Sequence, residues 1–148
     1  MAKRVGVQAI DAQIDYVRQN TATFIVCGRT PTDTATNVTR GSLGTIYGEV
    51  TVTTANFGAT ADGVGTAPAR RTTIDLTALT DDSADATYDD ASDGELAIVG
   101  LDANGGAGNA ANRVTLIHHA DDNTVSFNIG GTLSFTNTFD WEVSGVFT

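Results

Sequence analysis

The chain has 148 residues and a formal net charge of −10 at pH 7, from 18 acidic and 8 basic residues. Nucleic acids and anionic membranes both select basic surfaces, so this charge balance argues against either as a partner. No apolar run approaches the roughly 20 residues of a membrane-spanning helix, and the single cysteine excludes an internal disulfide.

The length predicts a single domain over residues 1–148, beginning with a loose arm. A short amphipathic helix is predicted over about residues 7–20, because apolar residues recur there at helical spacing: Val7, Ile10, Ile14 and Val17. We expect this stripe to pack on a sheet and the helix to end near Asn20, which tolerates a left-handed cap. No apolar segment follows Lys3-Arg4, so we expect no secretory signal and synthesis in a cytoplasm.

The next apolar run, Thr23–Cys27, predicts a short strand at the centre of a sheet. Cys27 is expected to be buried there as a small hydrophobic residue, because free cysteine is among the most buried residue types. Gly28 and Pro31 end the run, and Thr30–Gly41 reads as a polar loop.

Strand-like sequence returns in Leu43–Thr54. The Gly- and Ala-rich stretch Ala55–Pro68 has little to bury and predicts a long exposed loop. Arg70–Leu79 predicts another strand, with Ile74 and Leu76 on its buried face.

The segment Asp81–Glu95 contains a cluster of acidic residues: Asp81, Asp82, Asp85, Asp89, Asp90, Asp93 and Glu95. Clustered carboxylates suit calcium, which prefers oxygen ligands. The EF-hand spacing fails, because a loop starting at Asp89 has Ala91 at its third position and Gly100 at its twelfth. A solvated acidic turn is the favoured interpretation, with calcium as the alternative.

An interior strand is predicted over Glu95–Leu101, which is apolar on both faces. The following Asp102–Ala111 is rich in glycine and predicts a flexible hairpin tip. It lacks the lysine and the strand-then-helix setting of a phosphate-binding loop.

The last third, Asn112–Val146, alternates apolar and polar residues with a period of two, which is typical of half-buried strands. The apolar rows are Val114, Leu116 and His118; Val125, Phe127 and Ile129; Leu133 and Phe135; and Phe139, Trp141 and Val143. Turn-forming residues separate them, so we expect an antiparallel meander with one buried face. With the earlier strands this gives about seven or eight, and the fold class predicted is a mainly β, antiparallel β-sandwich (jelly-roll or Ig-like) with one short N-terminal helix.

No set of side chains with catalytic spacing is found. His118 and His119 are adjacent on a predicted strand, so they face opposite sides and cannot chelate one metal together. No serine has glycine both two residues before and two residues after it, and the paired carboxylates fall in turns. We therefore expect no enzyme and name no catalytic, metal-binding or cofactor-binding residue.

Three features together resemble the small virion structural proteins of tailed bacteriophages. They are the helix leading into Ala22–Cys27 with Pro31 beyond it, the apolar strand Glu95–Leu101, and the final strand Asn137–Val143 with its Phe-Asp-Trp-Glu core. The resemblance implies a head decoration (cement) protein on the outside of the capsid, or a tail or fibre component, and no catalytic residues. The Asp81–Asp93 and Asp102–Ala111 stretches depart from the compact pattern of such proteins. The implied location is the virion, and the implied partners are the major capsid protein or other virion proteins, with a homo-oligomer also compatible.

The charge is divided unevenly along the chain. Residues 1–71 hold seven basic and five acidic groups, and residues 72–148 hold one basic and 13 acidic groups. We expect the first half to face the shell through five basic side chains, with the Asp-rich loops outward. These five are Lys3, Arg4, Arg18, Arg29 and Arg40. The alternative is a carbohydrate- or calcium-dependent binding module, in which Trp141, Tyr47 and Tyr88 are candidates for stacking on sugars, although Trp141 is expected to be buried.

Overall fold

The computed structural model describes residues 3–4, 6–28, 38–64, 69–84, 96–119, 125–128, 131–144 and 146–147. Within these ranges the chain is mainly β, with a single α-helix, α1 (Val7–Asn20), near its start. The strands are β1 (Lys3–Arg4), β2 (Thr23–Cys27), β3 (Ile46–Thr51), β4 (Ala61–Asp62), β5 (Ala69–Ile74), β6 (Thr80–Asp81), β7 (Ala97–Leu101), β8 (Val114–His119), β9 (Val125–Asn128), β10 (Thr132–Phe135), β11 (Phe139–Ser144) and β12 (Val146–Phe147). The predicted mainly β, antiparallel fold class with one N-terminal helix is confirmed.

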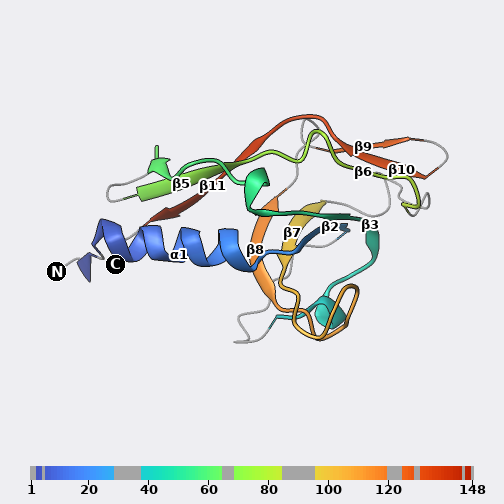
Figure 1. Cartoon of the computed structure of the whole chain (residues 1–148), viewed down its shortest axis with the longest axis horizontal. Helices are drawn as coiled ribbons and strands as arrows, with labels where there is room; N and C mark the ends of the chain where they lie inside the picture. The colour runs from blue at the N-terminus through green and yellow to red at the C-terminus, as the bar shows by residue number, and fades with distance from the viewer. Residues whose placement is uncertain are drawn as a thin grey trace.

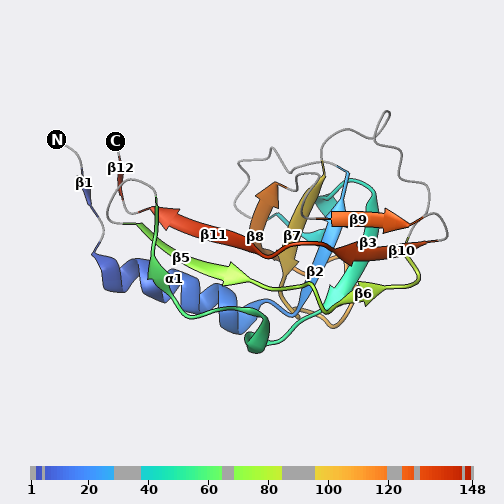
Figure 2. The same ribbon diagram turned by 90° about the horizontal axis from the view of Figure 1, so that it is seen from above.

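The strands form two layers, which Figures 1 and 2 show from two directions. One layer is the antiparallel sheet β3-β2-β7-β8, and the other contains the sheets β11-β5-β4 and β6-β10-β9. Helix α1 packs against β5, β11 and β8 through Ile10, Ile14 and Val17, as predicted. Val7, the fourth residue of the predicted stripe, is 43% exposed instead. The core between the layers combines side chains from α1 and both layers: Val17, Phe24, Val26, Val50, Val52, Phe57, Ile74, Leu76, Ala84, Ile98, Leu116, Leu133, Phe135 and Phe139.

Strands β2 and β7 lie at the centre of the four-stranded sheet, and both are buried along their whole length. Their second face forms a separate apolar cluster of Ile25, Cys27, Ala97, Val99 and Leu101, against which Leu43 and Ile46 pack. Coverage on both faces explains why their sequences are continuously apolar instead of alternating. The predictions of a central strand at Thr23–Cys27 and of a buried Cys27 are confirmed. The interior strand predicted over Glu95–Leu101 is confirmed as Ala97–Leu101.

The predicted meander over Asn112–Val146 is wrong, although its strands exist. Only β9 and β10 pair with each other, whereas β8 pairs with β7 and β11 pairs with β5. Strands that follow one another in sequence are therefore divided between different sheets. Alternation specifies which face of a strand is buried, but it does not specify the neighbouring strand.

The predicted row of Val114, Leu116 and His118 is also split between two faces. The β7–β8 register shifts between Gly100 and Leu101, so that Leu101 pairs with Val114 while Gly100 pairs with Leu116. This β-bulge turns Val114 to the second face, and Leu116 remains in the core between the layers.

Helix α1 ends without the expected left-handed cap at Asn20. Positive φ is found only at glycines among the described residues, and the C-cap, Thr21, is extended. The last carbonyls are instead satisfied by side chains, because Asn20 Nδ2 donates to Tyr16 O at 2.7 Å and Thr21 Oγ1 donates to Val17 O at 2.7 Å. No helix in the described ranges is long and apolar enough to span a bilayer.

The predicted exposed loop Ala55–Pro68 contributes to the core instead. Phe57 is buried, its ring centroid lies 6.0 Å from that of Phe24, and its backbone bridges to Ile74. Strand β4 then pairs with β5. The predicted strand Arg70–Leu79 ends early, at Ile74, because Asp75 Oδ1 accepts hydrogen bonds from Thr77 N at 3.0 Å and Thr77 Oγ1 at 2.6 Å and so closes a turn.

Candidate functional site

The basic residues predicted to face a partner are not equivalent in the structure. Arg18 is bound within the fold, with Nη1 2.5 Å from Asp15 Oδ1 and Nη2 donating to Gly58 O at 2.7 Å. Arg40 is likewise paired, its Nη2 2.5 Å from Glu49 Oε2. Their charges are already balanced internally, so neither forms a free basic surface.

Lys3 and Arg4 form β1, whose partner is β12, with Lys3 opposite Phe147 and Arg4 opposite Val146. The structure brings this short sheet to the end of the molecule that also carries the start of α1 (Figures 1 and 2). Arg29 lies outside the described residues. Of the predicted interface, Lys3 and Arg4 are thus the pair placed together at one end.

Most of the acidic segment proposed as a calcium alternative, residues 85–95, lies outside the described residues. Of its first residues, Asp81 is occupied within the fold, because Oδ2 accepts from Glu49 N at 2.8 Å and Oδ1 accepts from Ser83 N at 2.9 Å. In the part of the chain that the structure describes, no three His, Cys, Asp or Glu side chains are grouped as a metal site would require.

Both histidines lie on β8, and the ring of His118 stacks on Phe139 with centroids 4.3 Å apart. His118 thus packs against the edge of the core. The three aromatic residues considered for sugar stacking differ in their exposure. Tyr47 is buried, Tyr88 lies outside the described residues, and Trp141 is half-buried at the core edge instead of fully buried.

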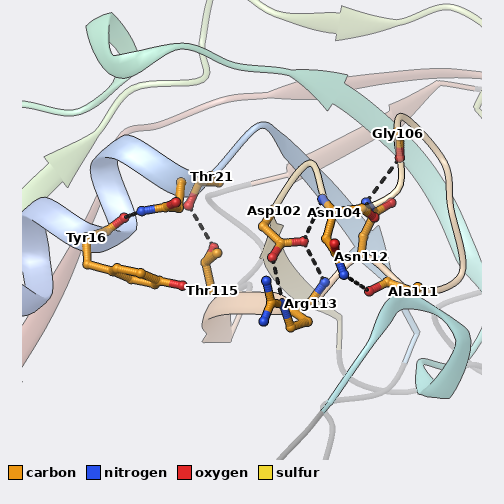
Figure 3. A network of polar contacts seen from close by, with 10 residues as sticks. Tyr16, Thr21, Asp102, Asn104, Gly106, Ala111, Asn112, Arg113 and Thr115 are labelled. Atoms are coloured by element: carbon orange, nitrogen blue, oxygen red, sulfur yellow. Dashed lines mark hydrogen bonds and ion pairs between the residues drawn. The ribbon is translucent and has the colours of Figure 1, made fainter.

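The hairpin between β7 and β8 is the most densely hydrogen-bonded loop described, and Figure 3 shows its polar network. Asp102 is 8% exposed, and its Oδ1 accepts from Asn104 N at 3.1 Å and from Arg113 N at 2.8 Å. Arg113 Nε donates to Asp102 Oδ2 at 3.0 Å. The carboxylate therefore fixes both ends of the loop predicted as a flexible tip.

Asn112 fills the interior of this loop and is 2% exposed. Its Nδ2 donates to Asn104 O at 2.8 Å and to Gly106 O at 3.1 Å, so one amide group satisfies two converging carbonyls. Convergent carbonyls are a usual setting for a cation, and here a side-chain amide occupies that place. The loop can thus be organised by its own asparagines. Gly105, Gly106 and Gly108 supply the positive φ angles that the tight path requires.

Two carboxylates in these networks have lowered pKa values. Burial raises the pKa of Asp102, but hydrogen bonds from the N–H groups of Arg113 and Asn104 and from the Arg113 guanidinium outweigh it. Burial likewise raises the pKa of Asp81, and the hydrogen bonds from Glu49 N and Ser83 lower it by more. In both residues the net pKa lies below the ordinary aspartate value, because the hydrogen bonds favour the charged form.

We expect acid to weaken the fold through these carboxylates. Their unfolded-state pKa is the higher one, so their stabilisation is complete above about pH 4 and is lost as pH falls through the lower folded-state values. Urea unfolding at pH 7 should show that Asp102→Asn lowers the free energy of unfolding by about 1–2 kcal/mol. At pH 3 the difference from wild type should shrink. The exposed Asp82→Asn is the matched charge control, and a deficit of Asp102→Asn that is equal at both pH values would contradict this assignment.

Two grooves lie on either side of the end of α1. A polar groove of about 560 Å³ is lined by the helix end and the β7–β8 loop, including Asn20, Asp102 and Arg113. A second groove of about 420 Å³ lies between α1, β8 and β11, and its lining is uncharged: Ala12, Gln13, Tyr16, Val17, Thr115 and Trp141. This second groove could not be predicted from a local pattern, because its residues are far apart in the chain. The exposed Tyr16, on the polar side of a predicted amphipathic helix, was the available signal.

No family model, no curated protein and no solved structure matches this chain.

Proposed function

We propose that this chain is a structural protein of a bacteriophage virion, and within that class a decoration protein on the outside of the head shell. The proposal begins from the resemblance of its element order to small virion proteins. A fold whose polar side chains are largely occupied with one another fits a protein that works by binding a larger assembly. A tail or fibre component is the alternative position in the same particle.

The observation that supports an attachment surface most directly is the pairing of β1 with β12. It places Lys3 and Arg4 at one end of the molecule, where α1 begins with the exposed Val7. The tip that follows β4 lies near the same end, because β4 pairs with the start of β5 and Asp62 and Asp11 both bind Arg70. That tip carries Val64, which is 84% exposed. We call the surface formed by β1, Val7 and Val64 the terminal pole.

The terminal pole combines a strand of basic sequence, Lys3-Arg4, with the exposed valines Val7 and Val64, in a chain whose net charge is −10. Surfaces that combine basic and apolar residues are typical of the patch where a protein binds a partner. A repeated shell lattice multiplies weak contacts, so a small surface is sufficient when many copies bind. Of the five basic residues predicted to form the interface, the proposal keeps Lys3 and Arg4. It adds the exposed residues Val7 and Val64.

Mass spectrometry of purified particles from the source of this chain tests the proposal. A copy number comparable with that of the shell protein supports head decoration, and a few copies per particle supports the tail. A variant with Lys3→Glu, Arg4→Glu and Val64→Asp should be depleted from particles, whereas Arg18→Gln, on a different surface, should be retained if it folds. Particles that lack the chain altogether would overturn the proposal.

A further inference from the structure

We propose that the groove between α1, β8 and β11 binds a neutral saccharide, with Tyr16 and Trp141 stacking on the sugar and Thr115 accepting a hydrogen bond from one of its hydroxyls. This goes beyond a place in a virion and does not depend on it. The volume of about 420 Å³ lies within the roughly 300–1,000 Å³ usual for small-molecule sites.

Two aromatic side chains flank the groove from different elements. Tyr16, on α1, is 57% exposed, and Trp141, on β11, packs against the core edge while still lining the groove. An aromatic ring has a flat apolar face. The C–H face of a pyranose matches such a surface, and its hydroxyls remain free to reach polar groups at the edges.

Thr115 supplies a polar group whose direction the structure fixes. Thr21 Oγ1 donates to Val17 O at 2.7 Å, which uses the only proton of that hydroxyl. The 2.7 Å contact between Thr21 Oγ1 and Thr115 Oγ1 then requires Thr115 to be the donor, as Figure 3 lets the reader follow. Thr115 is one of the residues that line the groove, and with its proton directed to Thr21 its Oγ1 can accept a hydrogen bond but not donate one, so a ligand group that binds it must donate. A sugar hydroxyl donates, whereas an ether or carbonyl oxygen cannot.

The charge of the site and of the chain argues against an anionic ligand. All six lining residues are uncharged, and Gln13 at the rim offers both an amide donor and an acceptor. The surrounding chain has a net charge of −10, which repels carboxylated or sulfated sugars. An uncharged, hydroxyl-rich ring compound satisfies the rings, the acceptor and the charge together.

The protein carries its own reporter for the test, because Trp141 is the only tryptophan. The intact chain is titrated with maltotriose, cellotriose, mannotriose and N-acetylchitotriose while its tryptophan emission is recorded. We expect a saturable change with at least one of these. Tyr16→Ala and Thr115→Val should each weaken that binding about tenfold, the equivalent of about 1.4 kcal/mol.

Two matched variants separate binding from folding. Thr115→Ser keeps the hydroxyl and Gln8→Ala alters an exposed residue of the same helix outside the groove, so both should bind as wild type does. Circular dichroism confirms that each variant is folded. The proposal is overturned if none of the four saccharides gives a saturable change, or if Tyr16→Ala and Thr115→Val bind with wild-type affinity.

Discussion

Phe24→Ala should lower the free energy of unfolding by about 3–5 kcal/mol, the usual cost of removing a buried phenylalanine side chain. Phe24 is fully buried on β2, and its ring lies 6.0 Å from that of Phe57 and 6.2 Å, edge to face, from that of Phe139. The three rings come from three segments, so the cavity would open where the two layers meet. Urea denaturation followed by far-ultraviolet circular dichroism measures the loss.

Tyr16→Ala is the matched control for this prediction, because it also removes an aromatic ring but from an exposed position. Its cost should be within about 0.5 kcal/mol. Phe24→Leu, which retains most of the buried volume, should fall between the two. Equal destabilisation by Phe24→Ala and Tyr16→Ala would show that Phe24 is not at the centre of the core.

Asn112→Asp should destabilise the protein by about 2–3 kcal/mol at pH 7, although the two side chains have nearly the same shape. The amide Nδ2 of Asn112 donates to the carbonyls of Asn104 and Gly106 inside the β7–β8 loop. A carboxylate in its place would present a negative oxygen to two carbonyl oxygens in a site that water barely reaches. Thermal or urea unfolding at pH 7 measures the effect.

Asn109→Asp provides the control within the same loop. Asn109 also donates through Nδ2, to Gly105 O at 3.0 Å, but it is exposed, so water can replace the lost bond. Its Oδ1, which accepts from Ala111 N, survives the change. We expect a cost below about 1 kcal/mol, and a loss as large as that of Asn112→Asp would show that burial is not the cause.

Local pattern was sufficient to predict the elements whose environment is uniform. The bounds of α1 follow from the spacing of Ile10, Ile14 and Val17, because one stripe faces one surface. Strands β2 and β7 follow from runs that are apolar on both faces, because both faces are covered. In these segments the spacing of the apolar residues is sufficient to predict which side chains are buried.

Strand partners were not predictable in the same way. The alternation in Phe139–Ser144 indicated a strand and its buried face, yet its neighbour is Ala69–Ile74 from mid-chain. The bulge at Gly100/Leu101 turns Val114 to the opposite face of the sheet, and no residue type in that segment indicates an extra residue in β8. Pairing and register depend on contacts between distant segments, which a period of two does not encode.

The features of the candidate sites also depend on contacts between distant segments. The burial of Asn112 and Phe57 depends on contacts with other parts of the chain. For this reason the composition of Asp102–Ala111 predicts a flexible tip and that of Ala55–Pro68 an exposed loop, and both predictions are wrong. The spacing Asp102-x-Asn104 is typical of an Asx turn and was the available signal for the first. For the Tyr16 and Trp141 groove the only signal was the position of Tyr16 off the apolar stripe of the helix. It does not indicate the other residues of the groove, because they come from distant parts of the sequence.

The order β3-β2-β7-β8 also has a kinetic consequence. Strand β2 meets β3 soon after it in the chain, but it cannot complete the sheet until β7 arrives, when Thr23 pairs with Leu101. The entropy lost in closing that long loop precedes any gain from the contacts it creates, so non-local topologies of this kind cross their barrier on the millisecond-to-second scale. Helix α1 and the β9–β10 pair depend on local contacts, so we expect both to form early and the meeting of β2 with β7 to limit the folding rate.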